Sequence, residues 1–279
     1  MTSHPAFVAS STKAAKVYLC TSAGWSDGVD LPAGLAAQAK AQGFTGASGQ
    51  VVMSASSDGA MDAVTFGLGD GGDALAVAGL SAKLPEATYT IAADGGVPLA
   101  HIAAGWADGA YRFDRYLKTK ATPPRLVIGK GKAADAITRE ALAVDRVRDL
   151  VNTPAEDMGP VNIQATISDL AERYGATLET IVGDALLDNN YPMVHAVGRA
   201  GPQAPRFLEL SWGPENAPEL AIVGKGVAFD TGGLNLKTGG FMRLMKKDMG
   251  GAAHAIGLAE LVMGAGLPVR LKLYVPAVE

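Results

Sequence analysis

The stretch LAIVGKGVAFDTGGLNLKTGGFMRLMKKDMGG, residues 220–251, joins a short apolar run to a glycine-rich loop and then to the start of a small-residue helix. Leu220–Val223 is a continuous apolar run, which is typical of a buried strand. Lys225 follows it after Gly224, at the position where an α/β sheet commonly presents an active-site group. The chemistry and the fold are therefore both to be sought around this stretch.

The segments on either side alternate between strand and helix patterns. Arg125–Gly129 reads as a short buried strand, and Ala133–Val151 carries apolar residues three or four apart, as a helix does. Pro160 opens a second helix, and Val269–Val275 alternates apolar and polar residues, as a strand does. Strands that alternate with helices predict an α/β fold with a largely parallel sheet.

The N-terminal part predicts a smaller α/β domain at residues 1–122. Thr119–Pro124 is the best linker, because its paired prolines stop both helices and strand ladders. The second domain then covers residues 123–279. The elements expected in the first domain are strands at Lys16–Leu19, Gln50–Met53 and Ala63–Phe66, and helices at Leu31–Gln42 and His101–Tyr116.

Gly67–Gly72 formally matches the G-x-G-x-x-G pattern of dinucleotide sites. That pattern indicates a nucleotide only where it joins a strand to a helix. Asp70-Gly71 is instead typical of a hairpin turn, so we expect Val64–Phe66 and Leu75–Val77 to pair as antiparallel strands.

Composition excludes several classes of protein. The 279 residues carry a net charge of −4, and residues 1–120 have no cluster of Lys and Arg, which argues against nucleic-acid binding. Cys20 is the single cysteine, so no internal disulfide forms. The sequence has no signal peptide and no apolar run long enough for a membrane span, so we predict a cytoplasmic protein without a membrane partner.

The sequence contains no pattern typical of a histidine-based metal site or of a serine or thiol nucleophile. The histidines are scattered, no G-x-S-x-G elbow is present, and His254, on a small-residue helix, reads as a packed or hydrogen-bonded core group. Asp230 and Asp248 lie beside glycines that allow close backbone approach to an ion, and a divalent cation would relieve the repulsion between them. Solvated loop charges around glycine turns are the alternative reading of these residues.

Val223–Gly251 strongly resembles the leucyl aminopeptidase family, whose signature runs VGKG-x-x-FD-(S/T)-GG-x-x-x-K and then MK-x-DMGGAA. The segments Gly109–Tyr116, Val151–Pro154 and Leu267–Glu279 agree with the same family. The resemblance implies a smaller N-terminal α/β domain followed by the first part of a mixed-sheet α/β aminopeptidase catalytic domain. It also implies a hydrolase that acts on peptide substrates and releases N-terminal residues, preferentially apolar ones.

The family pattern implies a role for each matching residue. Lys225, Asp230 and Asp248 would be ligands of two divalent metal ions, which would be Zn²⁺ or Mn²⁺ or else Mg²⁺. Lys237 would be the catalytic lysine that polarises the scissile carbonyl, and Met245 would line the side-chain pocket or else be a core methionine. A homohexamer is the assembly that the resemblance implies for an intact chain.

The match also has a gap. The family's NTDAEGR motif, with its two further carboxylate ligands and its arginine, is absent from the sequence, which ends at Glu279. We therefore expect half of a two-metal site and an unpaired edge on the Val269–Val275 strand. The alternative function is a truncated, catalytically incomplete member of the family that acts as a non-enzymatic or split subunit. DNA binding by the N-terminal domain is a second alternative, against which the charge argues.

Overall fold

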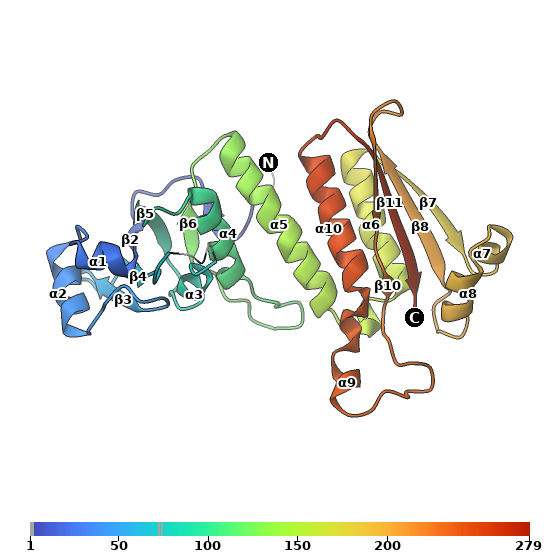
Figure 1. The fold of residues 1–279 in the computed structure, drawn as a ribbon, viewed down its shortest axis with the longest axis horizontal. Helices are drawn as coiled ribbons and strands as arrows, with labels where there is room; N and C mark the ends of the chain where they lie inside the picture. The colour runs from blue at the N-terminus through green and yellow to red at the C-terminus, as the bar shows by residue number, and fades with distance from the viewer. Residues whose placement is uncertain (1–2, 72, 74) are drawn as a thin grey trace. The chain divides into compact units, whose positions relative to one another are not determined.

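The structure is a computed structural model that describes residues 3–71, 73 and 75–279 (Figure 1). The chain divides into two compact units, Met1–Ala141 and Leu142–Glu279. Each unit is built around its own β-sheet and its own hydrophobic core. Among the described residues, no helix combines the length and the apolar character that crossing a bilayer requires.

The first unit holds a six-stranded sheet in the order β1-β6-β5-β2-β4-β3. Neighbouring strands are parallel except β3, which runs antiparallel to β4. Trp106, Tyr89 and Phe66 are fully buried in its core. The strands are β1 (Phe7–Val8), β2 (Ala15–Cys20), β3 (Val51–Ala55), β4 (Met61–Gly67), β5 (Thr88–Ala93) and β6 (Arg125–Val127), and the helices are α1 (Ser22–Ser26), α2 (Ala33–Ala41), α3 (Ala78–Ser81) and α4 (Leu99–Ala110).

The three strands and the Leu31–Gln42 helix predicted for this unit are confirmed, but the predicted hairpin is wrong. Leu75–Val77 forms the turn that leads into α3 and does not pair with β4. A Cβ atom on Gly105 of α4 would lie 3.2 Å from the Cβ of Val77, so this segment packs closely on a helix instead. Gly72 of the G-x-G-x-x-G pattern lies outside the described residues. The helix predicted for His101–Tyr116 ends earlier, at Ala110.

The residues around the predicted linker remain attached to the first sheet. Residues 119–124 form no helix or strand, as the prolines predict. β6 follows them and pairs with both β1 and β5. The indole of Trp106 also donates a hydrogen bond to the Pro124 carbonyl at 3.0 Å. The boundary between the two compact units therefore lies after the predicted linker, within the long helix α5 (Lys132–Asn152).

The second unit holds a mixed five-stranded sheet in the order β10-β11-β8-β7, with β9 also paired to β11. Helices α6 and α10 pack on this sheet, and α7 and α8 contact β7, β8 and β11. Its strands are β7 (Thr177–Val182), β8 (Arg206–Trp212), β9 (Glu219–Val223), β10 (Gly226–Val227) and β11 (Arg270–Val278). Its helices are α6 (Pro160–Tyr174), α7 (Ala185–Asp188), α8 (Pro192–Gly198), α9 (Gly240–Arg243) and α10 (Gly250–Gly264), with 3₁₀ turns η1 (Ala155–Asp157) and η2 (Met245–Met249).

The expectation of an unpaired edge on the Val269–Val275 strand is wrong. This strand, β11, runs antiparallel to β8 on one side and parallel to β9 and β10 on the other. Leu271, Leu273 and Val275 are fully buried in the core of the unit. β11 is therefore an interior strand that holds the site-bearing segment in register.

Candidate active site

Lys225 lies in a short interruption between β9 and β10. Both strands pair with β11 in one register, with Val223 opposite Tyr274 and Gly226 opposite Ala277, which places Lys225 opposite Pro276. Proline has no N–H to donate, so the ladder loses a hydrogen bond at this point. The interruption coincides with the missing N–H of Pro276, while the Gly224 N–H still donates to the Tyr274 carbonyl of β11 at 2.9 Å.

Helix α10 fills the space beside this interruption. The N–H of Ala252 donates to the Lys225 carbonyl at 2.9 Å. A Cβ atom on Gly224 would lie 2.7 Å from both the Cα of Ala252 and the Cβ of Ala255, so only glycine allows the helix so close. The small residues at the start of α10 therefore bring its preceding turn, η2, onto the end of β9.

The first ion pair of the site joins Lys225 to Asp248 of η2. The Nζ atom of Lys225 donates to Oδ2 of Asp248 at 2.6 Å. The Lys225 side chain is 58% exposed, whereas that of Asp248 is only 13% exposed. Met249, the next residue, is completely buried in the core and holds this end of η2. The carboxylate is thus the fixed partner, and the lysine reaches it from the solvent side.

The second ion pair joins Asp230 to Lys237 across a glycine loop. The Lys237 Nζ atom donates to Oδ1 of Asp230 at 2.7 Å, and the Gly232 N–H donates to the same oxygen at 3.2 Å. Gly232 and Gly233 adopt φ angles of 75° and 93°, which residues other than glycine rarely adopt. The loop folds back at these glycines, so a lysine seven residues further on reaches the carboxylate.

The two ion pairs lie in one electrostatic field. The hydrogen bond from Lys237 is the main cause that holds the pKa of the Asp230 carboxyl below its usual value. Partial burial opposes this effect, while the charge of Lys237, the Gly232 N–H and the charge of Lys225 support it. Because the Lys225 charge acts on Asp230 as well as on Asp248, the four side chains form one charged cluster.

The donor set of this cluster fits part of a divalent metal site. Two carboxylates supply hard oxygen ligands, and each is neutralised here by an ammonium group. Lysine could ligate only as the neutral amine. In the part of the chain that the structure describes, no group of three or more His, Cys, Asp or Glu side chains is placed to hold a metal ion. The described residues therefore provide fewer carboxylates than a closed metal site needs.

The other residues singled out from the sequence lie nearby with less defined environments. Met245 is half-buried at the start of η2, which leaves both of its readings open. His254 is exposed on α10 and not packed in the core, and its Nδ1 atom lies 2.7 Å from the Gly250 carbonyl. Sequence reasoning missed Lys246, whose ammonium donates to the Asn152 carbonyl at the end of α5.

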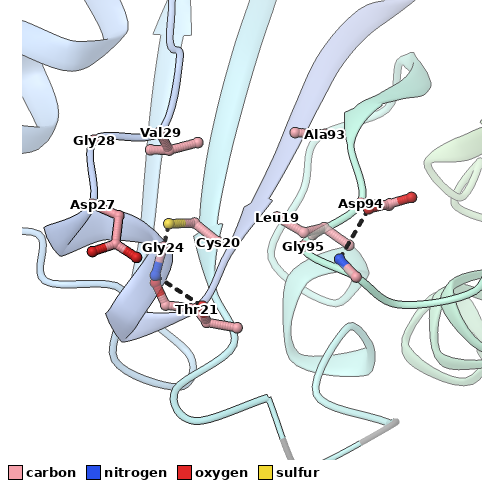
Figure 2. A pocket seen from close by; sticks show the side chains of 11 residues that line it. Leu19, Cys20, Thr21, Gly24, Asp27, Gly28, Val29, Ala93, Asp94 and Gly95 are labelled. Atoms are coloured by element: carbon pink, nitrogen blue, oxygen red, sulfur yellow. Dashed lines mark hydrogen bonds between the residues drawn. The ribbon is translucent and has the colours of Figure 1, made fainter.

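A separate hollow of about 390 Å³ lies in the first unit, where β2 and β5 end (Figure 2). Its walls combine the apolar residues Leu19 and Val29 with Asp27 and Asp94. Two of its backbone donors are used within the hollow, since the Gly96 N–H donates to Asp94 at 2.9 Å and the Gly24 N–H donates to the Thr21 hydroxyl at 3.0 Å. This hollow contains none of the ionisable residues of the charged cluster.

Two family models match the chain. Residues 145–279 match the cytosol aminopeptidase family, catalytic domain, and residues 21–129 match the M17 aminopeptidase, N-terminal domain. All four residues of the charged cluster lie within the first of these matches. The predicted α/β architecture, with an N-terminal domain followed by part of a mixed-sheet catalytic domain, is confirmed.

Individual relatives agree with the family models. A probable cytosol aminopeptidase from Rhodococcus opacus (strain B4) is 34% identical over 63% of this chain and 38% of its own length. Peptidase B of Serratia proteamaculans (strain 568) is 41% identical over 47% of this chain and 32% of its own length. The chain thus spans less than half the length of these curated relatives.

Solved structures extend the likeness to both units. The cytosol aminopeptidase from Coxiella burnetii superposes with a TM-score of 0.85 and 35% identity, over 97% of this chain and 60% of that one. The bottromycin maturation enzyme BotP in complex with Mn gives a TM-score of 0.78 and 32% identity, over 96% of this chain and 60% of that one.

Proposed function

The chain belongs to the cytosol aminopeptidase family, and on this premise we propose that it provides part of an active site that releases N-terminal residues from peptides. The substrates would be peptides with a free N-terminus, preferentially with an apolar first residue. Location in the cytoplasm and assembly as a homohexamer stay predictions from the sequence.

One observation carries the proposal, which is that four charged residues of the family signature lie together in the charged cluster. Lys225 and Asp248 pair at 2.6 Å, and Asp230 and Lys237 pair at 2.7 Å. The members of this cluster are 23 residues apart in one pair and seven in the other. Solvated loop charges, the alternative reading, can also form surface ion pairs, so the metal-binding test below decides between the two readings.

In the proposed mechanism each residue has a separate task. Asp230, Asp248 and the neutral amine of Lys225 would hold divalent cations, and Mn²⁺ is the first choice because BotP is a relative that was solved with Mn. When bound, the cations would supply an activated water nucleophile. Lys237 would turn its ammonium toward the scissile carbonyl oxygen and stabilise the negative charge that develops there. Met245 would contact the first side chain of the substrate.

The proposal is tested by Mn²⁺-dependent release of leucine from a leucyl anilide with a free amine, with an N-acetylated substrate as the control. Asp230→Asn should abolish both Mn²⁺ binding and activity, because a neutral amide is a poor ligand for a hard cation. Asp188→Asn, on the exposed end of α7, is the matched substitution that should leave both unchanged. Full activity in folded Asp230→Asn would remove the assignment of the site.

A non-catalytic or split subunit is the second candidate. It is favoured by the small number of carboxylates that the described residues bring to the cluster. In that case the folded chain of 28.5 kDa would show no activity alone, and a second polypeptide that supplies further carboxylates would restore it. Activity from the chain alone would exclude this candidate.

A further inference from the structure

Lys246 connects the end of one helix to the turn that carries Asp248. It lies in η2, two residues before Asp248, and is half-buried. Its Nζ atom donates a hydrogen bond to the backbone carbonyl of Asn152, the last residue of α5. The two ends of this bond are 94 residues apart in the sequence, so it fixes η2 to a distant element.

The end of α5 is a suitable place for this ammonium. The last carbonyls of a helix have no partners within the helix and carry partial negative charge. The last turn of α5 has no basic residue of its own, so the positive charge comes from η2. The N–H and hydroxyl of Thr153 donate to the Asp149 carbonyl at 3.0 and 2.6 Å, and the Asn152 carbonyl accepts from Lys246.

The turn η2 needs such an anchor, because a short 3₁₀ segment is weakly held by its own backbone bonds. Met249 holds its C-terminal end in the core, and the Ala252 N–H ties the start of α10 to Lys225. Lys246 provides the corresponding hold on the N-terminal side of Asp248. The Asp248 carboxylate therefore lies between two fixed points.

We infer that Lys246 is a positioning residue, whose bond to the end of α5 fixes the Asp248 carboxylate and so sets how tightly it holds a divalent cation. The bond itself is a feature of the fold, and only its effect on cation affinity rests on the proposed function. Lys246 touches neither the substrate nor the cation in this role. It acts through the backbone of η2.

The test compares Lys246→Met and Lys246→Arg with Lys83→Met in the whole chain. Lys83 also donates to a backbone carbonyl, that of Gly49 at 3.1 Å, but lies in the first unit and so provides the matched control. The first readout is amide hydrogen exchange without metal, which should accelerate at residues 245–252 in Lys246→Met only. The second is the Mn²⁺ dissociation constant by titration calorimetry, which should rise about tenfold in Lys246→Met.

Lys246→Arg should keep both the exchange rate at residues 245–252 and the Mn²⁺ dissociation constant near the wild-type values. The reason is that a guanidinium also carries the charge that the helix end favours. Unchanged exchange at residues 245–252 in folded Lys246→Met would overturn the positioning role. Faster exchange with an unchanged Mn²⁺ constant would overturn the effect on the cation. If the wild-type chain binds no Mn²⁺, the proposed metal site fails, while the exchange data still decide the role of Lys246. If Lys246→Met does not fold, Lys246→Gln takes its place, with a smaller increase expected in both readouts.

Discussion

Asp230 and Lys237 show how the same pair of side chains can be read in two ways. The pair at 2.7 Å is a structural contact in this chain, and the lowered pKa of Asp230 keeps its carboxylate charged. A charged carboxylate is what a divalent cation requires. The ammonium of Lys237 therefore bonds to a carboxylate oxygen that we assign to the cation. It must leave that oxygen before the cation can bind there.

Lys237→Met separates these two roles. In a preparation that releases leucine, kcat should fall by about 100-fold, because a donor to the developing oxyanion is lost. The Mn²⁺ affinity should rise, because a competing cation is removed from Asp230. Steady-state kinetics and titration calorimetry measure the two effects, with exposed Lys130→Met as the control. Loss of Mn²⁺ binding together with activity would contradict the separate roles.

Tyr89 predicts how the first unit responds to alkali. The side chain is fully buried, its hydroxyl donates to the Pro85 carbonyl at 3.0 Å, and burial raises its pKa to about 12. Because an unfolded tyrosine ionises near pH 10, this contribution to stability is complete below about pH 10 and is lost between about pH 10 and 12. Urea unfolding at about pH 9 and 11 should show a fall in the unfolding free energy.

Tyr89→Phe should reduce that fall by about 1 kcal/mol, because phenylalanine has no proton to lose. Tyr116→Phe is the control, since Tyr116 is exposed and should leave the alkaline fall as in the wild type. An equal alkaline fall of the unfolding free energy in Tyr89→Phe and Tyr116→Phe would show that Tyr89 does not cause it.

At the scale of elements, periodicity predicted the helices and strands that pack in a regular way. The apolar spacing of Ala133–Val151 gave α5 to within one residue at each end. The failures came from packing that a local pattern does not contain. Leu75–Val77 has the composition of a strand, but Gly105 of α4 lets that helix approach it closely. The partners of β11 come from segments far away in the sequence, so its interior position could not be read from the alternation alone.

Gly224 tests whether close packing of α10 defines the second unit. Gly224→Ala should lower the unfolding free energy by about 1–3 kcal/mol, because the new methyl group would meet the backbone of Ala252. Gly34→Ala is the control. Gly34 lies in α2 with open space around it, so alanine should stabilise that helix by up to about 1 kcal/mol. Urea unfolding followed by circular dichroism measures both, and a neutral Gly224→Ala would contradict the packing.

At the scale of the whole molecule, the sequence predicted two parts and one site, and the structure adds how the site is supported. The signature residues could be singled out because their segment resembles the family signature, whereas their spacing alone left solvated loop charges as an alternative. The supports could not be found, because they are backbone contacts. Lys246 bonds to a carbonyl, and Pro276 acts by lacking an N–H. Both residues lie within the family segments quoted from the sequence, but a motif names the residue and not the backbone group that it meets.

The common register of β9 and β10 along β11 has a consequence for changes in chain length. A strand advances by about 3.3 Å for each residue. Removing one residue from 226–228 would therefore move Asp230 along β11 by that distance relative to Lys225 and Asp248. The tip of the glycine loop, at Thr238–Gly240, carries no such constraint from the sheet. When the loop is redesigned, insertions and deletions should accordingly be placed at its tip. They should be avoided in the segment whose register on β11 sets the position of Asp230.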